Sequence, residues 1–117
     1  MVVDATAPIT INVLANPYAH IDAMRQLDPA TSIWYNLFPE GQQGYCTVDQ
    51  TCWINLRLHN IGTAAGQVYL KITRTDINYI IWNQTYNLER DAYVDIDQIS
   101  FIMPLSNITL VFEIGHY

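Results

Sequence analysis

The sequence has few charged residues, and positive charge is the scarcest. Charged residues make up 14% of the 117 residues, with five Lys and Arg against eleven Asp and Glu, for a net charge of −6. The basic residues do not cluster: they are Arg25, Arg57, Lys71, Arg74 and Arg90. Because clustered Lys and Arg provide most of the non-specific affinity for phosphate backbones, we expect neither nucleic acid nor an anionic membrane as a partner.

Long apolar runs are missing as well. None approaches the roughly 18 residues that span a bilayer, so we expect no membrane insertion. Residues 1–10, MVVDATAPIT, lack the basic start and the apolar stretch of a signal peptide. Three explanations stay open: the protein remains inside the cell, a leader has been removed, or the chain is carried within an assembly.

Catalytic and metal-binding motifs are the third absence. His20, His59 and His116 are far apart and have no ligand-like spacing, and no serine lies in a Gly-x-Ser-x-Gly turn. Tyr93, Asp95 and Asp97 share one strand face, which suggests calcium or acid–base chemistry, but without a glycine-containing ligand loop a solvated strand face is favoured. We therefore expect no enzyme, no metal and no cofactor.

The sequence contains only two cysteines, Cys46 and Cys52. Two thiols are too few for a structural zinc site, and their spacing matches no common zinc pattern. A disulfide between them would close a small loop before a strand and stabilise the fold by about 2 kcal/mol. We predict this disulfide, with two free thiols as the alternative. A bridge would fit an oxidising compartment or a hyperthermophile.

Alternation of apolar and polar residues is abundant. Residues 53–73, WINLRLHNIGTAAGQVYLKIT, contain two alternating runs around a turn at residues 60–63. A period of two indicates half-buried strands, and we expect these two to form an antiparallel pair. The inward-facing positions are Ile54, Leu56, Leu58, Val68, Leu70 and Ile72.

Five further segments have strand character: residues 9–14, 32–38, 79–86, 93–103 and 108–114. In the first, Ile9, Ile11 and Val13 alternate with Thr10, Asn12 and Leu14. The apolar phase of 93–103 changes after Gln98, which predicts a β-bulge. Residues 19–28 place Ile21, Met24 and Leu27 three apart and predict a short helix that ends before Pro29.

Seven short strands with turns between them favour an all-β fold. We predict a single domain, residues 1–117, folded as an antiparallel immunoglobulin-like sandwich of about seven strands with one short helix near residues 19–28. A partly closed barrel is the alternative.

Two segments resemble known β domains. Residues 54–73 resemble the core of CARDB-type immunoglobulin-like domains of bacterial and archaeal surface proteins, in which a strand enters an Asn-x-Gly turn; Asn60, Gly62 and Gly66 match it. Residues 86–117 are similar to the ends of modular domains in tail, spike and surface proteins, with a Phe-x-Met-Pro turn at Phe101–Pro104 before the last strand. The resemblance implies a structural or adhesive module and no catalytic residues.

Aromatic residues are the candidate contact sites. Trp53 and Tyr69 fall on the outward phase of their strands, and with Trp82 they are the predicted partner-binding residues. Ordinary packing and carbohydrate binding are the alternatives, and we expect Trp34 or Trp82 to fill the core. Asn83 and Asn107 lie in Asn-x-Thr sequons, which are glycosylation sites only if the protein is exported.

These observations predict a non-catalytic structural or adhesive module that acts by protein–protein contact. We expect it outside the cell, on a virion or a cell surface, for example in an archaeal virus or surface assembly. Its partner would be another protein or further copies of itself. A carbohydrate-binding module that uses the outward aromatics and a small intracellular ligand-binding β-barrel are the alternatives.

Overall fold

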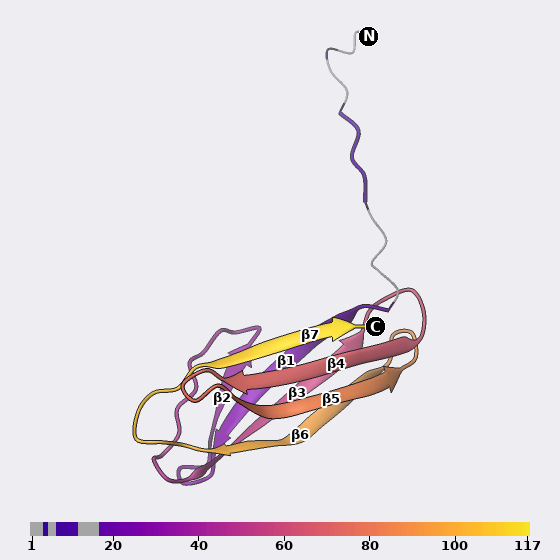
Figure 1. The fold of residues 1–117 in the computed structure, drawn as a ribbon. Coiled ribbons are helices and arrows are strands. Elements are labelled where there is room, and N and C mark those ends of the chain that lie inside the picture. Colours follow the sequence, from indigo (N-terminus) through magenta and orange to yellow (C-terminus); the bar gives the residue numbers. More distant parts are fainter. Residues whose placement is uncertain (1–3, 5–6, 12–16) are drawn as a thin grey trace.

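The computed structural model describes residues 4, 7–11 and 17–117, and these contain seven β-strands in two sheets (Figure 1). The described residues include no helix, and hence none that is long and apolar enough to cross a membrane. The strands are β1 (Ala19–Asp28), β2 (Ile33–Phe38), β3 (Thr51–Asn60), β4 (Gly66–Arg74), β5 (Tyr79–Leu88), β6 (Tyr93–Ile102) and β7 (Leu110–His116).

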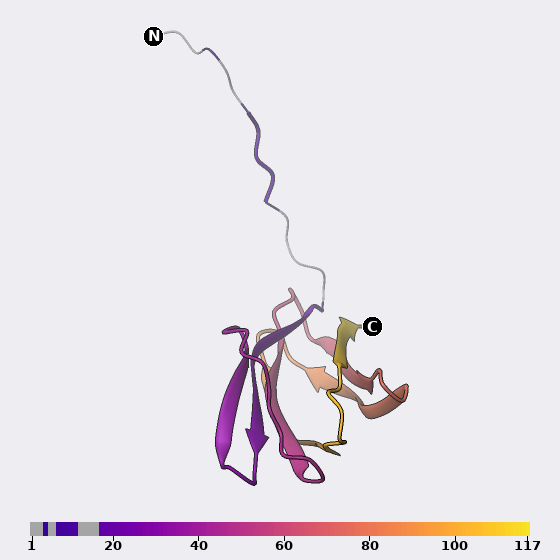
Figure 2. The ribbon, with the colours of Figure 1, turned by 90° about the vertical axis from the view of Figure 1, so that its left-hand side faces the viewer.

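The two sheets differ in size. One has the strand order β2-β1-β3-β6 and the other the order β5-β4-β7, and all pairs are antiparallel. Across the interior β7 lies near β1 and β5 lies near β6, so β2 extends beyond the smaller sheet, and none of the described strands lies opposite it (Figure 2). The fold is thus an all-β sandwich of two separate sheets; the barrel alternative is not observed in the described part of the chain.

The core is built mainly from the inward-facing residues of β3 and β4, which the alternation identified. The six inward-facing residues predicted on these two strands are at most 4% exposed. Ala19, Ile96 and Ile99 complete the buried cluster. The predicted strands at 32–38, 79–86, 93–103 and 108–114 correspond to β2, β5, β6 and β7. The bulge is also confirmed: Ile54 faces Ile99 and Leu56 faces Ile96, so that β6 has one residue more than β3 between these pairs.

The expected pairing of β3 with β4 is wrong, because the two strands belong to different sheets. Residues 61–65 carry the chain from one sheet to the other. Asn60 holds this crossover: it is fully buried, its Oδ1 accepts hydrogen bonds from the amides of Gly62 and Tyr18, and its Nδ2 donates to the carbonyls of Ala64 and Leu88. A period of two identifies which side chains face the core, but it does not identify the neighbouring strand.

The predicted helix at residues 19–28 is also wrong; these residues form β1, which is paired on both sides. The register with β3 shifts between Ile21 and Ala23, which adds one residue to β1. This bulge places Ile21 and Met24, three residues apart, on the same core-facing side. The spacing that suggested a helical face therefore comes from an irregular strand.

The predicted strand at residues 9–14 lies partly outside the described residues, because residues 12–14 are not described. Residues 7–11 belong to neither sheet and are drawn apart from both in Figure 1. Ile9 and Ile11 are 87% and 90% exposed. Seven strands were expected and the described residues contain seven, but β1 is among them in place of the strand predicted at 9–14.

Candidate docking groove

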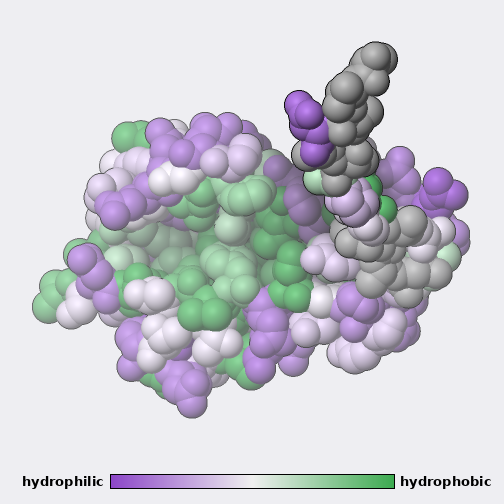
Figure 3. All heavy atoms as spheres, turned by 90° about the horizontal axis from the view of Figure 1, so that it is seen from above, coloured by the Kyte–Doolittle hydropathy of each residue, from purple (hydrophilic) through white to green (hydrophobic). Residues whose placement is uncertain are grey.

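A groove of about 480 Å³ opens between β7 and the loop segment 43–46. Seen from the β7 side in Figure 3, apolar residues line a hollow between more polar borders. We call this hollow the β7 groove. It is lined by Gln26, Leu37, Gln43, Gly44, Tyr45, Cys46, Ile54, Phe101, Met103, Asn107, Ile108, Leu110 and Phe112, none of which is charged.

One wall of the groove is a free strand edge. β7 pairs with β4 and has no partner on its other side among the described strands. Leu110, Phe112 and Ile114 pack against the core, whereas Val111 is 50% exposed on the outer face. In a strand with one partner, alternate backbone N–H and C=O groups point towards the free side. This wall therefore offers hydrogen-bonding backbone beside apolar side chains.

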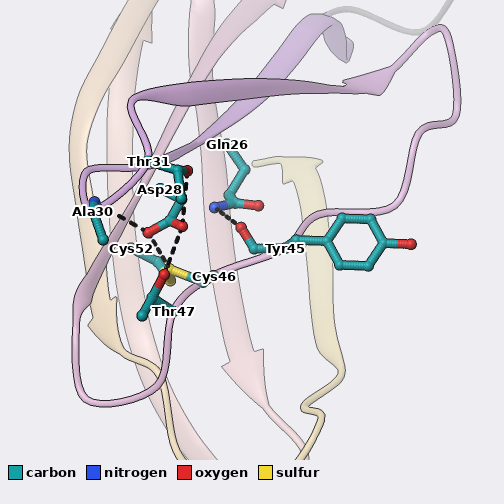
Figure 4. Close-up of a disulfide and its surroundings, with 8 residues drawn as sticks. All are labelled: Gln26, Asp28, Ala30, Thr31, Tyr45, Cys46, Thr47 and Cys52. Carbon is teal, nitrogen blue, oxygen red and sulfur yellow. Dashed lines mark hydrogen bonds between the residues drawn. A yellow bond between two sulfur atoms is a disulfide. The ribbon is translucent and has the colours of Figure 1, made fainter.

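The facing wall is the segment 43–46, which is attached to β1 and β3. Gln26 is buried in β1, and its Nε2 donates a hydrogen bond of 3.0 Å to the carbonyl of Tyr45 (Figure 4). Gly44 lies so close to Gln26 that a Cβ atom there would be 2.5 Å from its Oε1. The predicted disulfide between Cys46 and Cys52 is present, with 6.2 Å between the Cα atoms, and joins the segment to buried β3. These contacts hold the wall in place.

Asp28 ties the same loop to the end of β1. The residue is 3% exposed, and its carboxylate accepts hydrogen bonds from the hydroxyls of Thr31 (3.0 Å) and Thr47 (2.9 Å) and from the amide of Ala30 (3.3 Å) (Figure 4). Burial opposes ionisation of this carboxyl, but its hydrogen bonds with Thr47, Thr31 and Ala30 outweigh that effect and lower its pKa. The ionised form of Asp28 therefore stabilises the attachment of the groove wall.

A second hollow, of about 390 Å³, lies on the outer face of the larger sheet and is lined by charged residues. There Arg57 donates to Asp95 through Nε (2.8 Å) and a second nitrogen (3.1 Å), and its guanidinium lies 3.8 Å from the ring centre of Tyr93. The hydrogen bonds from Arg57 lower the pKa of Asp95. Arg57 and Asp95 form an ion pair on this face, and within the described residues no cluster of three or more His, Cys, Asp or Glu could hold a metal ion.

His59 joins three segments on that outer face. Its Nδ1 lies 2.9 Å from Asp22 on β1, and its Nε2 lies 2.9 Å from the Asp91 carboxylate in the loop before β6. Burial opposes protonation of the ring, but the two carboxylates outweigh it and raise the pKa of His59. Like the ion pair of Arg57, this contact fits a structural role.

The predicted contact aromatics are not brought together. Trp53 alternates with buried neighbours on the outer face of the larger sheet, and Tyr69 does the same on the outer face of the smaller one. Trp82 packs against the core, and its Nε1 donates to the hydroxyl of Tyr86 at 3.1 Å. Two of the three therefore lie on opposite faces of the sandwich, and their predicted role in partner binding stays a prediction.

The two predicted glycosylation residues are both exposed, Asn83 on β5 and Asn107 at the border of the β7 groove. Trp34 is 40% exposed on β2, which leaves Trp82 as the tryptophan that packs against the core. The groove itself was not predicted, because its residues come from separate segments of the chain. The Phe-x-Met-Pro turn was its one local signal, since Phe101 and Met103 line it.

Comparison with known proteins gives no further guide to this site. No family model, curated protein or solved structure matches the chain.

Proposed function

We propose that the protein is a non-catalytic structural or adhesive module that acts by protein–protein contact at the β7 groove. The observation that carries this proposal is an uncharged, largely apolar groove beside a strand edge that has no partner among the described strands. Such an edge can accept an added strand, whose backbone forms hydrogen bonds while alternate side chains fill the hollow. The low charge of the chain favours association, because few ions have to be desolvated.

The proposal includes an immunoglobulin-like fold. In immunoglobulin sandwiches strands A, B and E lie side by side in one sheet, and strands C, F and G lie in the other. The order β1-β3-β6 fits A, B and E, and β4-β7 fits C and F, with β5 in the place of C′. In this correspondence strand G would lie beside β7, where the groove opens. The position of Asn60, Gly62 and Gly66 at the crossover supports the proposed likeness to CARDB-type domains.

We place this contact on a virion or a cell surface. The disulfide supports an oxidising compartment, where such bridges persist. Its location beside the groove supports a role in keeping the docking site intact outside the cell.

Fractionation of the native source tests this proposal. An antibody against the chain would follow it through particle, envelope, secreted and cytosolic pools, with a known cytosolic protein as the control. Recovery in a complex with particles or envelope is expected. Recovery only as free cytosolic monomer would contradict the proposal.

A further inference from the structure

We infer that the β7 groove is filled by residues 7–14 of a second copy of this chain, which add to β7 as an antiparallel strand. This inference rests on the proposed contact function and names its partner. The acceptor would be the free edge of β7. The donor would be an apolar segment with strand character, whose described residues 7–11 belong to neither sheet.

The donor segment has the composition that strand addition requires. Its sequence is APITINVL, in which Ile9, Ile11 and Val13 share one side and Thr10, Asn12 and Leu14 share the other. Pro8 stands at the start, where a strand tolerates proline. Ile9 and Ile11 are 87% and 90% exposed in the isolated chain. These two side chains have no packing of their own, and docking would remove them from water.

The acceptor offers a matching surface. The groove is lined by apolar side chains from four strands: Leu110 and Phe112 of β7, Ile54 of β3, Phe101 of β6 and Leu37 of β2. An added strand beside β7 would lie opposite β2, the one strand of the larger sheet without a counterpart. Its other side, with Thr10, Asn12 and Leu14, would face solvent. The backbone of β7 would then form hydrogen bonds on its free side, and the added side chains would fill the hollow.

The position at which β1 begins indicates that the groove is filled by residues 7–14 of a second copy and not by those of the same chain. Pro17 is buried against Gly66, and the amide of Tyr18 bonds to Asn60, at the end of the sandwich where β7 finishes. Gln26, which lines the groove, lies about 26 Å further along β1 at roughly 3.3 Å per residue.

Residues 7–14 of the same chain lead into Tyr18, and β7 also ends beside Tyr18. If these residues lay along β7, the two segments would therefore run in the same direction. That would be a parallel pair, which is less stable per residue, and every strand pair in the described structure is antiparallel. A second copy is free to enter in the antiparallel direction.

The donor and the acceptor are different surfaces of the chain. An interface of this kind is heterologous, and when its rotation does not close a ring it produces an open row of subunits. We therefore expect head-to-tail oligomers that grow with protein concentration, with one free groove at one end and one free segment at the other.

The test compares two substitutions in the same segment of the full-length chain. Ile9→Asp with Ile11→Asp places carboxylates on the side that enters the groove, and we expect the dissociation constant to rise roughly 100-fold or more. Thr10→Asp adds a carboxylate on the solvent side and serves as the control, with association like that of the wild type. Light scattering after size exclusion, over a range of concentrations, gives the masses, and circular dichroism checks folding.

Oligomers that disappear in the double variant and persist in Thr10→Asp support the inference. Oligomers that persist in the double variant overturn it, yet leave the proposed contact function standing. A wild-type chain that stays monomeric at every concentration overturns the second-copy assignment, whether its groove is empty or filled by its own segment.

A peptide experiment checks the docking site without relying on assembly. The peptide APITINVL is added to the isotope-labelled double variant, and backbone amide shifts are followed by NMR, with the same peptide carrying aspartate in place of both isoleucines as the control. Shifts confined to β7, Leu37 and residues 43–46 support the inference. Shifts elsewhere, or none at millimolar peptide, overturn it.

Discussion

The two edges of the smaller sheet, β5 and β7, differ in how well the core beside them is covered. β5 lies near β6, and Trp82 and Tyr86 from its inner face pack against the core, joined by a hydrogen bond. β7 also contributes apolar side chains to the core, but beyond it the hollow opens towards Leu37 and the segment 43–46. The larger sheet has one strand more than the smaller one, and this mismatch falls entirely on the β7 side.

Large side chains cover the core on the β5 side, whereas we propose that an added strand covers it on the β7 side. Burial raises the pKa of the Tyr86 hydroxyl, a sign that the β5 side is shielded from water. The β7 side keeps an open volume of about 480 Å³. We therefore expect substitutions on the inner face of β5 to lower the free energy of unfolding. Substitutions that affect the segment 43–46 or residues 7–14 should instead weaken association between chains.

The largest effect on stability is expected at the closed edge. Trp82→Ala would remove a large side chain that packs on the core and leave the Tyr86 hydroxyl without its donor, and we expect a loss of about 3 kcal/mol in the free energy of unfolding. Urea denaturation measures it, and Tyr79→Ala, at an exposed position of the same strand, is the control. Equal losses for both variants would contradict the view that the β5 edge is closed by its inner aromatics.

Removal of the disulfide sharpens the comparison on the open side. The double variant Cys46→Ser, Cys52→Ser would lose about 2 kcal/mol of stability, because a short loop is released in the unfolded state. The wall 43–46 would also be held less firmly, so association through the groove should weaken in the folded variant. Denaturation and light scattering measure the two effects. Unchanged association would show that the wall does not shape the docking site.

Asp28 gives a smaller effect, which depends on pH. Its pKa is lower in the folded than in the unfolded state, so its carboxylate stabilises the fold above the unfolded pKa near 3.8, and this contribution is lost as the pH falls through the folded pKa. Asp28→Asn should therefore lose stability at pH 7 and show a shallower decline on acidification. Urea denaturation at several pH values checks this, and a parallel decline in both proteins would count against it.

His59 gives the smallest effect and lies away from the groove. Its pKa is raised in the folded state, so its contribution is full below the unfolded pKa of 6.5 and is lost as the pH rises through the folded pKa. His59→Gln should remove this decline in stability and leave association unchanged. Thermal denaturation between pH 5.5 and pH 8.5 (roughly one to two units on either side of the unfolded value) measures it. A pH-dependent change in association would place His59 in the interface instead.

The sequence predicted which side chains of a strand face the core better than it predicted which strands lie next to each other. Alternation located the buried side chains of β3 and β4 and the bulge of β6, because a half-buried strand must alternate. It did not reveal that residues 61–65 cross between sheets, since that depends on the hydrogen bonds of buried Asn60. Ile21 and Met24 have helix-like spacing because the bulge in β1 puts two residues that are three apart on the same side of the strand.

The candidate site was less predictable than the fold. The disulfide was predicted from the number and spacing of the cysteines and is present. The strand predicted at residues 9–14 is not formed by residues 9–11, and its pairing with β7 of a second copy stays a proposal. The groove was not predicted, because its walls come from β1, β2, β3, β6, β7 and two loops that meet only in three dimensions. The outward aromatics Trp53 and Tyr69 drew attention to the sheet faces, whereas the structure directs it to an edge.

Amide hydrogen exchange at low and high protein concentration tests the difference between the edges most directly. If the segment 7–14 of a second copy adds to β7, the outward amides of β7 and the amides of residues 9–13 should become protected together as concentration rises, while the outward amides of β5 exchange at an unchanged rate. Equal protection of both edges, or no change at β7 while oligomers form, would contradict the account.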